Sequence, residues 1–307
     1  MSPLAISLIL ISAFIHASWN LLAKRVPMRD EVFLIALVAG MVLLTPVGLV
    51  YASAFAIVPD VVWLLVIVAG AFQALYFTCL LSAYSHGDLS LAYPVARSSP
   101  LIVVTVMSVI LGRGHEISLQ AVVGIVVIVA AGFVLPMERL GQFRLKNYLN
   151  KMSAFALGAA CGTAGYSILD DAALRVLRAP AVLGETLSVS EISLLYLFLE
   201  SVSTVVWLAV WVGGRRVVRR RSTRETSIGS RELSIAVLMG AMIYATYGIV
   251  LISMAYAVNV SYIVAFRQVS LPIGVLMGLL VLKERGGILR FAATLVLVAG
   301  LVLIATG

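Results

Sequence analysis

The sequence predicts an all-α integral membrane protein of ten transmembrane helices, arranged as two inverted repeats of five helices each. Three observations support this fold class. Of the 307 residues, 62% are hydrophobic and only 12% are charged, and the mean hydropathy is +1.09. Apolar stretches of similar length follow one another along the whole chain, and landmarks of the first half recur in the second. A soluble protein could not cover so apolar a chain with polar groups, so lipid must be its solvent.

The apolar stretches have the length of membrane-spanning helices. A bilayer core is crossed by about 20 apolar residues in an α-helix, in which every backbone polar group finds its partner within the segment. No Lys or Arg precedes the first stretch, which continues to Leu22, so we expect a retained helix and not a cleaved signal peptide. The ten expected spans are residues 4–24, 32–52, 60–83, 90–111, 117–136, 152–174, 190–212, 233–255, 261–282 and 288–306.

Matching landmarks divide the chain into two repeats. Trp19 in the first span corresponds to Tyr166 in the sixth at an offset of 147 residues, and Pro100 corresponds to Pro272 at an offset of 172. Five spans per repeat is an odd number, so the second repeat enters the membrane from the opposite side, as in many transporters. The expected units are a first repeat at 1–137, a linker at 138–151 and a second repeat at 152–307, which contains an arginine-rich loop at 213–232.

Basic residues are distributed unevenly between the two sides of the membrane. Loops after odd-numbered spans hold seventeen Lys and Arg residues, whereas loops on the other side hold Arg113, Arg175 and Arg178. We expect the protein in the cell (inner or plasma) membrane. Because cytoplasmic loops are enriched in Lys and Arg, this bias places both termini on the non-cytoplasmic side. The arginine run at 213–232 could in principle bind nucleic acid, but a loop beside anionic lipid headgroups explains it better. We therefore expect no nucleic-acid partner.

Two arginines remain inside the spans. Arg97 and Arg267 each lie about seven residues into a repeat-related span, and Pro100 and Pro272 follow them. A charge in the bilayer centre is costly, so such residues usually face a cavity or a partner. One interpretation is a substrate cavity in which the guanidinium groups bind an anionic group. The alternative is structural, with each arginine binding backbone carbonyls that proline leaves free or extending to the membrane surface.

The first span carries His16 and Asn20 on one helical face, because residues four apart are neighbours on a helix. A titratable His beside an amide could bind substrate or relay a proton. The alternative is a hydrogen bond between helices that holds the bundle together. For Trp19, between them, we expect an interfacial anchor.

Three carboxyl groups lie within the spans of the second half. Glu200 falls near the middle of the seventh span, where an isolated carboxylate is a candidate for proton coupling or for a structural ion pair. Asp170 and Asp171 lie near the end of the sixth span, and we expect them to be solvated at the interface.

The remaining candidates are polar side chains that could line a cavity. They are Gln73, Tyr76, Tyr166, Ser167, Tyr244 and Gln268. The sequence contains no Ser-His-Asp arrangement, no His or Cys spacing for a metal and no phosphate-binding loop. We therefore expect neither an enzyme nor a cofactor.

Two segments carry a family resemblance. The run from His16 to Lys24 and the run from Arg267 to Glu284, followed by Gly300-Leu-Val-Leu-Ile, resemble EamA-type members of the drug/metabolite transporter (DMT) superfamily. The resemblance implies a ten-helix carrier with a central cavity lined largely by spans 1, 3, 4, 6, 8 and 9, working without a cofactor. It also implies export of metabolites or exchange of solutes. Many members are thought to have cytoplasmic termini, which differs from the charge count and leaves the orientation open.

The function that we predict is secondary transport of a small, anionic or zwitterionic metabolite by alternating access. The protein would be an exporter or an exchanger. A channel-like facilitator is one alternative, although no filter motif is visible, and a lipid-modifying intramembrane enzyme is another. The partners expected are the metabolite and the lipid bilayer; the sequence leaves open whether two copies form a homodimer, and it identifies neither the metabolite nor the coupling ion.

Overall fold

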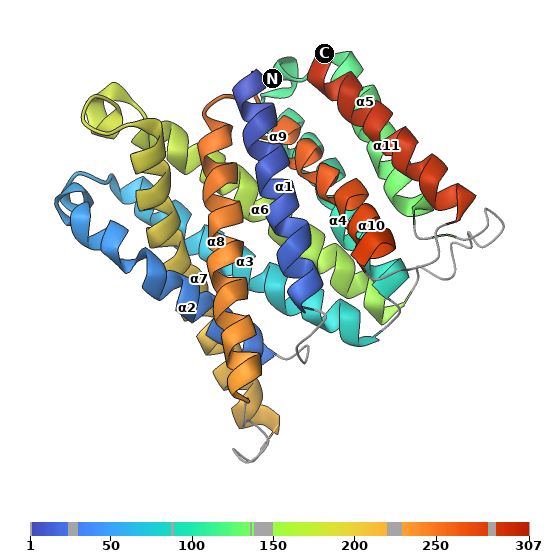
Figure 1. Ribbon diagram of the computed structural model, residues 1–307. Helices are drawn as coiled ribbons and strands as arrows, with labels where there is room; N and C mark the ends of the chain where they lie inside the picture. The colour runs from blue at the N-terminus through green and yellow to red at the C-terminus, as the bar shows by residue number, and fades with distance from the viewer. Residues whose placement is uncertain are drawn as a thin grey trace.

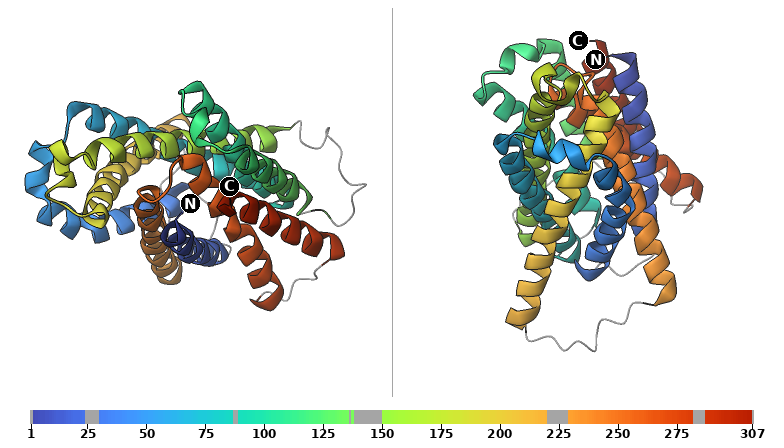
Figure 2. Two further views of the ribbon diagram at one scale, coloured as in Figure 1. Left: turned by 90° about the horizontal axis from the view of Figure 1, so that it is seen from above. Right: turned by 90° about the vertical axis from the view of Figure 1, so that its left-hand side faces the viewer.

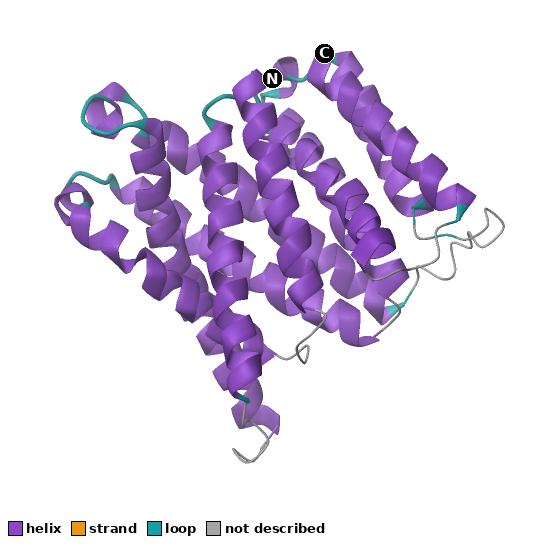
Figure 3. Ribbon diagram, viewed as in Figure 1, coloured by secondary structure: helices purple, strands orange, loops and turns teal. Residues whose placement is uncertain are grey.

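The computed structural model describes residues 2–23, 30–86, 89–135, 137, 150–219, 229–281 and 287–306. These residues form helices joined by turns, and no strand occurs among them (Figure 3). The all-α class predicted from the sequence is confirmed for this part of the chain.

The main helices follow the predicted spans closely. They are α1 (Pro3–Ala23), α2 (Asp30–Val50), α3 (Asp60–His86), α4 (Leu89–Ile110), α5 (Leu119–Val134), α6 (Lys151–Leu177), α7 (Val189–Arg219), α8 (Ser230–Met254), α9 (Val260–Phe266), α10 (Ser270–Val281) and α11 (Ile288–Thr306). Short helical turns connect them: η1 (Ala52–Ala56), η2 (Gly114–Glu116), η5 (Pro180–Gly184) and η7 (Arg267–Val269).

Eight segments in the described chain are long and apolar enough to cross a membrane. Seven lie in single helices, and the eighth, Val260–Met277, runs through α9, η7 and most of α10. The remaining apolar helices are shorter, namely Ser98–Ile110 within α4 and Leu119–Val134, which is α5. The chain is therefore a multi-pass membrane protein.

The arginine-rich loop is shorter than predicted. We expected a loop at 213–232, but α7 continues through Gly213 and Gly214 to Arg219, and α8 already begins at Ser230. One contact that holds the extension is the ion pair of Arg215 with Asp30, at 2.7 Å, which joins the end of α7 to the start of α2.

The two prolines that were expected to loosen their helices behave differently. Just before Pro272 the ninth span is interrupted: the 3-10 turn η7 separates α9 from α10. Pro272 sits in the first turn of α10, where a missing N–H costs nothing since no helical partner exists there. At Pro100 helix α4 continues, and this proline is among the residues that line a cavity, where a carbonyl without a helical donor is tolerated.

The chain termini lie at one end of the bundle (Figure 1). The backbone N–H of Ser2 donates to the carbonyl of Tyr256 after α8, and Gln120 at the start of α5 donates to Thr306 near the C-terminus. Helix α1 packs against α8, and α5 against α11, as the view from the termini end shows (Figure 2). Deeper in the bundle α3 packs along α6, and α2 contacts both α7 and α8.

Glycines allow the closest helix contacts. A Cβ atom at Gly240 of α8 would lie 1.8 Å from the carbonyl oxygen of Ala36 in α2, and one at Gly162 of α6 would lie 2.8 Å from the backbone of α3 at Tyr76. Small residues let the helix backbones approach and gain dispersion contacts that lipid tails do not replace. These contacts fix the positions of α3, α6 and α8, which form the walls of the site described next.

Candidate functional site

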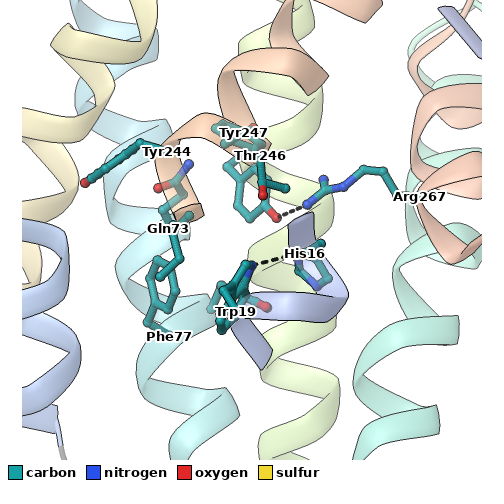
Figure 4. A pocket seen from close by; sticks show the side chains of 11 residues that line it. His16, Trp19, Gln73, Phe77, Tyr244, Thr246, Tyr247 and Arg267 are labelled. Carbon is teal, nitrogen blue, oxygen red and sulfur yellow. Dashed lines mark hydrogen bonds between the residues drawn. The ribbon is translucent and has the colours of Figure 1, made fainter. Parts of the chain in front are cut away.

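A central cavity lies where α1, α3, α6, α8 and η7 meet (Figure 4). Its empty volume is about 440 Å³, part of which is open to solvent. Its lining combines aromatic side chains with a few polar ones and one guanidinium group, as is usual for small-molecule sites. The lining residues are His16, Trp19, Gln73, Tyr76, Phe77, Tyr166, Ile243, Tyr244, Thr246, Tyr247 and Arg267.

Among the described lining residues, Arg267 is the cationic group of the central cavity. It begins the η7 turn, so the break in the ninth span places its side chain at the cavity wall. Its Nη2 donates to the hydroxyl of Tyr166 at 3.4 Å, and its guanidinium carbon lies 5.6 Å from the centre of the Tyr247 ring. An arginine held over an aromatic face keeps its charge and can present its N–H groups to a carboxylate or phosphate.

Aromatic rings form most of the remaining wall. Tyr166 makes edge-to-face contacts with Tyr76 and with Tyr247, at centroid distances of 6.1 Å and 5.5 Å, and Tyr76 contacts Phe77 in the same way. Such pairs hold one another in place, so the cavity has a firm apolar wall that could enclose a small organic molecule.

The Trp19 indole is a cavity-lining group and not an interfacial anchor, so that expectation is wrong. It is only 3% exposed, and its Nε1 donates to Nδ1 of His16 at 3.2 Å (Figure 4). Accepting this bond requires an unprotonated Nδ1. Asn20 lies one turn further along α1 and donates to the carbonyl oxygen of His16 at 2.7 Å, so it acts on the helix backbone and does not line the cavity.

A second, smaller cavity adjoins the first and shares Tyr76 and Arg267 with it. Its empty volume is about 260 Å³, and Gln268, Thr163 and Pro100 are among its other lining residues. Arg267 therefore lies between two spaces, one bounded by α8 and the other by α4.

Behind the central cavity lie two buried carboxyl groups, Asp170 and Glu200, which we call the carboxyl pair. Asp170 is 0% and Glu200 is 1% exposed, and each carboxyl group acts electrostatically on the other. Asp170 Oδ1 accepts a hydrogen bond from the Tyr196 hydroxyl at 2.7 Å, and its Oδ2 accepts one from Tyr247. We expected Asp170 to be solvated, which is wrong, because α7 and α8 cover this part of α6.

Glu200 binds a polar chain that leads to α3. Its Oε1 accepts from Nε2 of Gln73 at 2.6 Å, and Oε1 of Gln73 accepts from the Thr204 hydroxyl at 3.1 Å. Its Oε2 is buried without a hydrogen-bond partner. Glu200, which the sequence proposed as a proton carrier, thus lies next to Gln73 of the cavity wall.

A second charged cluster lies at the end of the bundle where the termini are. In this termini-side network Arg113 contacts Asp171 at 2.6 Å and Glu116 at 2.7 Å, and Arg175 contacts Asp171 at 2.9 Å. Asn259 donates to Glu116, and both arginines donate to the carbonyl of Val258. The Arg113 guanidinium holds the pKa of Glu116 below its ordinary value. Asp171 is buried here, so its expected solvation is also wrong.

Seven of the predicted site residues line the two cavities. His16, Gln73, Tyr76, Tyr166, Tyr244 and Arg267 line the central cavity, and Gln268 lines the second. Ser167 is fully buried on α6 and lines neither, and Asn20 binds its own helix. The side chain of Arg97 lies outside the described part of the chain.

Asp170 and Tyr247 are not among the site residues predicted from the sequence. Asp170 lies near the end of the predicted sixth span, which is why we expected it to be solvated, and Tyr247 is one of many apolar-span tyrosines with no distinguishing signal. The helix continues to Leu177, which puts Asp170 about two turns inside it. No cluster of three or more His, Cys, Asp or Glu residues that could hold a metal occurs in the described chain.

Comparisons with known proteins agree with this architecture. Residues 3–137 match the EamA-like transporter family, a family of membrane transporters within the DMT superfamily, so the resemblance noted in the sequence is confirmed there. A solved crystal structure of a protein with 18% sequence identity covers 98% of this chain and 96% of its own, with a TM-score of 0.67. At that identity the likeness shows a shared fold only. No curated protein has a matching sequence.

Proposed function

We propose that this chain, which matches the EamA-like transporter family over residues 3–137, is a secondary transporter that works by alternating access. The substrate would be a small anionic or zwitterionic metabolite, and the protein an exporter or an exchanger. The observation that carries the proposal is the central cavity, because groups from both halves of the chain form it around Arg267.

The cavity chemistry supports an organic substrate with an acidic group. Arg267 offers a positive charge and directed N–H donors, and the aromatic wall from Trp19 to Tyr247 offers apolar contact. An arginine fork binds a carboxylate or phosphate with two parallel hydrogen bonds.

Helix packing supports ten spans in two inverted repeats. Suppose that α1, α2 and α3 correspond to α6, α7 and α8, that α4 corresponds to α9–α10, and that α5 corresponds to α11. Exchanging the two halves then turns the contact of α1 with α8 into the contact of α6 with α3. The contact of α2 with α8 maps onto that of α7 with α3, and the contact of α4 with α6 maps onto that of α10 with α1. On this arrangement α4 and α5 complete the ten spans, although their apolar segments are shorter.

The distribution of basic residues supports an orientation in a cell membrane with both termini on the non-cytoplasmic side. The end of α7 and the start of α2, joined through Arg215 and Asp30, then lie at the cytoplasmic surface. The termini-side network lies at the opposite end and ties the loop before α5 to α6 and to the loop before α9. We infer that this network closes the outer path to the cavity and breaks when the protein opens outward.

A channel-like facilitator and an intramembrane enzyme remain the alternatives to be tested. A channel needs a continuous water path through the protein, whereas a carrier exposes its site to one side of the membrane at a time. An enzyme would need a nucleophile or metal beside an acid–base group. His16 is the histidine that lines the cavity, and its Nδ1 already accepts a hydrogen bond from Trp19.

The experiment has two stages. Purified protein is first screened for thermal stabilisation by carboxylate- and phosphate-bearing metabolites, because a molecule that binds only the folded state raises its stability. The best stabiliser is then radiolabelled, and its uptake into proteoliposomes preloaded with the same unlabelled molecule is measured. A carrier gives a transient, saturable overshoot. Uptake without overshoot would favour the channel, and chemical conversion of the molecule would favour the enzyme.

A further inference from the structure

Counted over the described residues, the carboxyl pair contains more negative charge than its surroundings balance. Asp170 on α6 and Glu200 on α7 face a single described cation, Arg267, whose field acts on both carboxyl groups. The other titratable groups around the pair that belong to the described residues are hydroxyls: Tyr196 on α7 and Tyr244 and Tyr247 on α8. His16 on α1 lines the same cavity but accepts a bond from Trp19. Two ionised carboxylates beside one guanidinium would leave one negative charge buried in the membrane, which is costly.

Hydrogen bonding indicates which carboxyl group is neutral. Both oxygens of Asp170 accept hydroxyl hydrogen bonds, which is the arrangement that suits an ionised carboxylate. Glu200 Oε1 accepts from Gln73, but Oε2 is buried with no donor. A buried carboxylate oxygen without a donor loses its hydrogen bonds to water and gains none in the protein, which is unfavourable. A proton on Oε2 removes the charge and converts that atom into a donor facing the neighbouring Asp170.

Tyr247 connects the carboxyl pair to the central cavity. Its hydroxyl donates to Asp170, while its ring lies in the cavity wall beneath the Arg267 guanidinium and against Tyr166. Gln73 makes a parallel connection, since it lines the cavity and donates to Glu200. A molecule entering the cavity therefore contacts the same side chains that hold the pair.

We propose that Asp170 and Glu200 together hold one exchangeable proton, carried on Glu200 Oε2 in the conformation described here, and that Arg267 couples this proton to the occupancy of the cavity. This inference rests on the proposed transport function and identifies its coupling site. The proton comes from water in the cavity and returns to it, so only an O–H bond forms and breaks and no electrons are transferred.

The sign of the coupling follows from the shared cation. Arg267 stabilises negative charge on the pair through its field. An anionic group bound to Arg267 cancels that field, so the pair binds its proton more readily when the cavity holds an anion. By reciprocity the protonated pair favours anion binding. Proton and anionic group are then carried together in one direction.

The test uses the ligand-free protein in lipid nanodiscs and pH-difference infrared spectroscopy. A neutral carboxylic acid has a carbonyl stretching band that an ionised carboxylate lacks. The wild type should show this band for a group shielded from bulk water, and Glu200→Gln should remove it. His16→Gln is the control for the other titratable group of the cavity and should leave it in place. Glu200→Asp keeps an acid at this position and should retain a shifted band, which guards against misfolding of the Gln variant.

The coupling is tested with Arg267→Gln, which mimics a neutralised guanidinium. At a fixed pH at which the wild type is partly protonated, this variant should show a stronger carboxylic acid band. Absence of the band in the wild type at every pH, its loss in His16→Gln, or an unchanged band in Arg267→Gln would overturn the proposal. The same preparations are assayed for counterflow, so a carrier without the band would refute the proton site and leave the transport function standing.

Discussion

Arg113 and Asp171 form a 2.6 Å ion pair that joins the loop between α4 and α5 to the last turns of α6. The pair connects the first half of the chain to the second at the termini end. Asp171 also receives Arg175, and Arg113 also reaches Glu116, so each partner is held by a neighbour. In a connected set of charges, each ordered side chain takes part in more than one ion pair. Such a network contributes more to stability than isolated surface ion pairs do.

Removing the Arg113 charge is expected to loosen the termini end. In Arg113→Gln the buried Asp171 loses its closest partner, and this end should open more often. We propose Ser261→Cys, at a buried position of α9 beneath the network, as the reporter, with Cys79 and Cys161 replaced by Ala. Labelling by a water-soluble maleimide should become several-fold faster. Arg231→Gln, an exposed arginine at the start of α8, is the matched control. Equal labelling rates in all three proteins would mean that the network does not close this end.

The lowered pKa of Glu116 predicts a pH dependence of stability. A carboxyl group whose pKa is depressed on folding stabilises the folded state above its ordinary pKa, and this contribution is lost as the pH falls through the lowered value. Glu116→Gln should therefore lower the thermal unfolding temperature at neutral pH, and the difference from the wild type should disappear in acid. Thermal unfolding of both proteins in detergent, followed over a series of pH values, measures it. A difference that stayed constant with pH would assign the effect to packing.

The contact between α2 and α8 predicts a large effect of one methyl group. A Cβ at Gly240 would lie 1.8 Å from the Ala36 carbonyl oxygen, so Gly240→Ala must push two helices apart. Overpacking of this kind costs about 1–3 kcal/mol. Gly274→Ala in α10 is the control, because no heavy atom lies within 4 Å of its added Cβ, and alanine favours a helix by up to about 1 kcal/mol. The unfolding temperature should fall in Gly240→Ala and should stay level or rise in Gly274→Ala. Similar unfolding temperatures for the two variants would refute the close contact.

The sequence predicted the helices well because membrane spans are set by local properties. Length, apolar content and loop residues are read directly from the chain, and the expected spans match the helices within a few residues outside α7 and the interrupted ninth span. The extension of α7 is held by a contact that no local pattern encodes, the ion pair of Arg215 with Asp30. The break of the ninth span at Arg267 lies just before Pro272, which is visible in the sequence.

The site was predicted less completely, for a different physical reason. Polar residues in mid-span are rare enough to identify Arg267, Gln73 and Glu200. Depth alone, however, does not say which helices cover a residue. Trp19 resembled an anchor because tryptophan is common at membrane surfaces, and only the packing of α1 against α8 turns it inward. Asp170 was missed because its two tyrosine partners come from α7 and α8.

The central claim is that Arg267 receives the acidic group of the transported molecule. Isothermal titration of the wild type, Arg267→Gln and Arg231→Gln with the metabolite found in the thermal screen tests it most directly. A hydrogen bond to a charged group contributes about 1.5–3 kcal/mol, so Arg267→Gln should weaken binding about tenfold or more. Arg231→Gln should bind like the wild type. Wild-type affinity in Arg267→Gln would contradict the account.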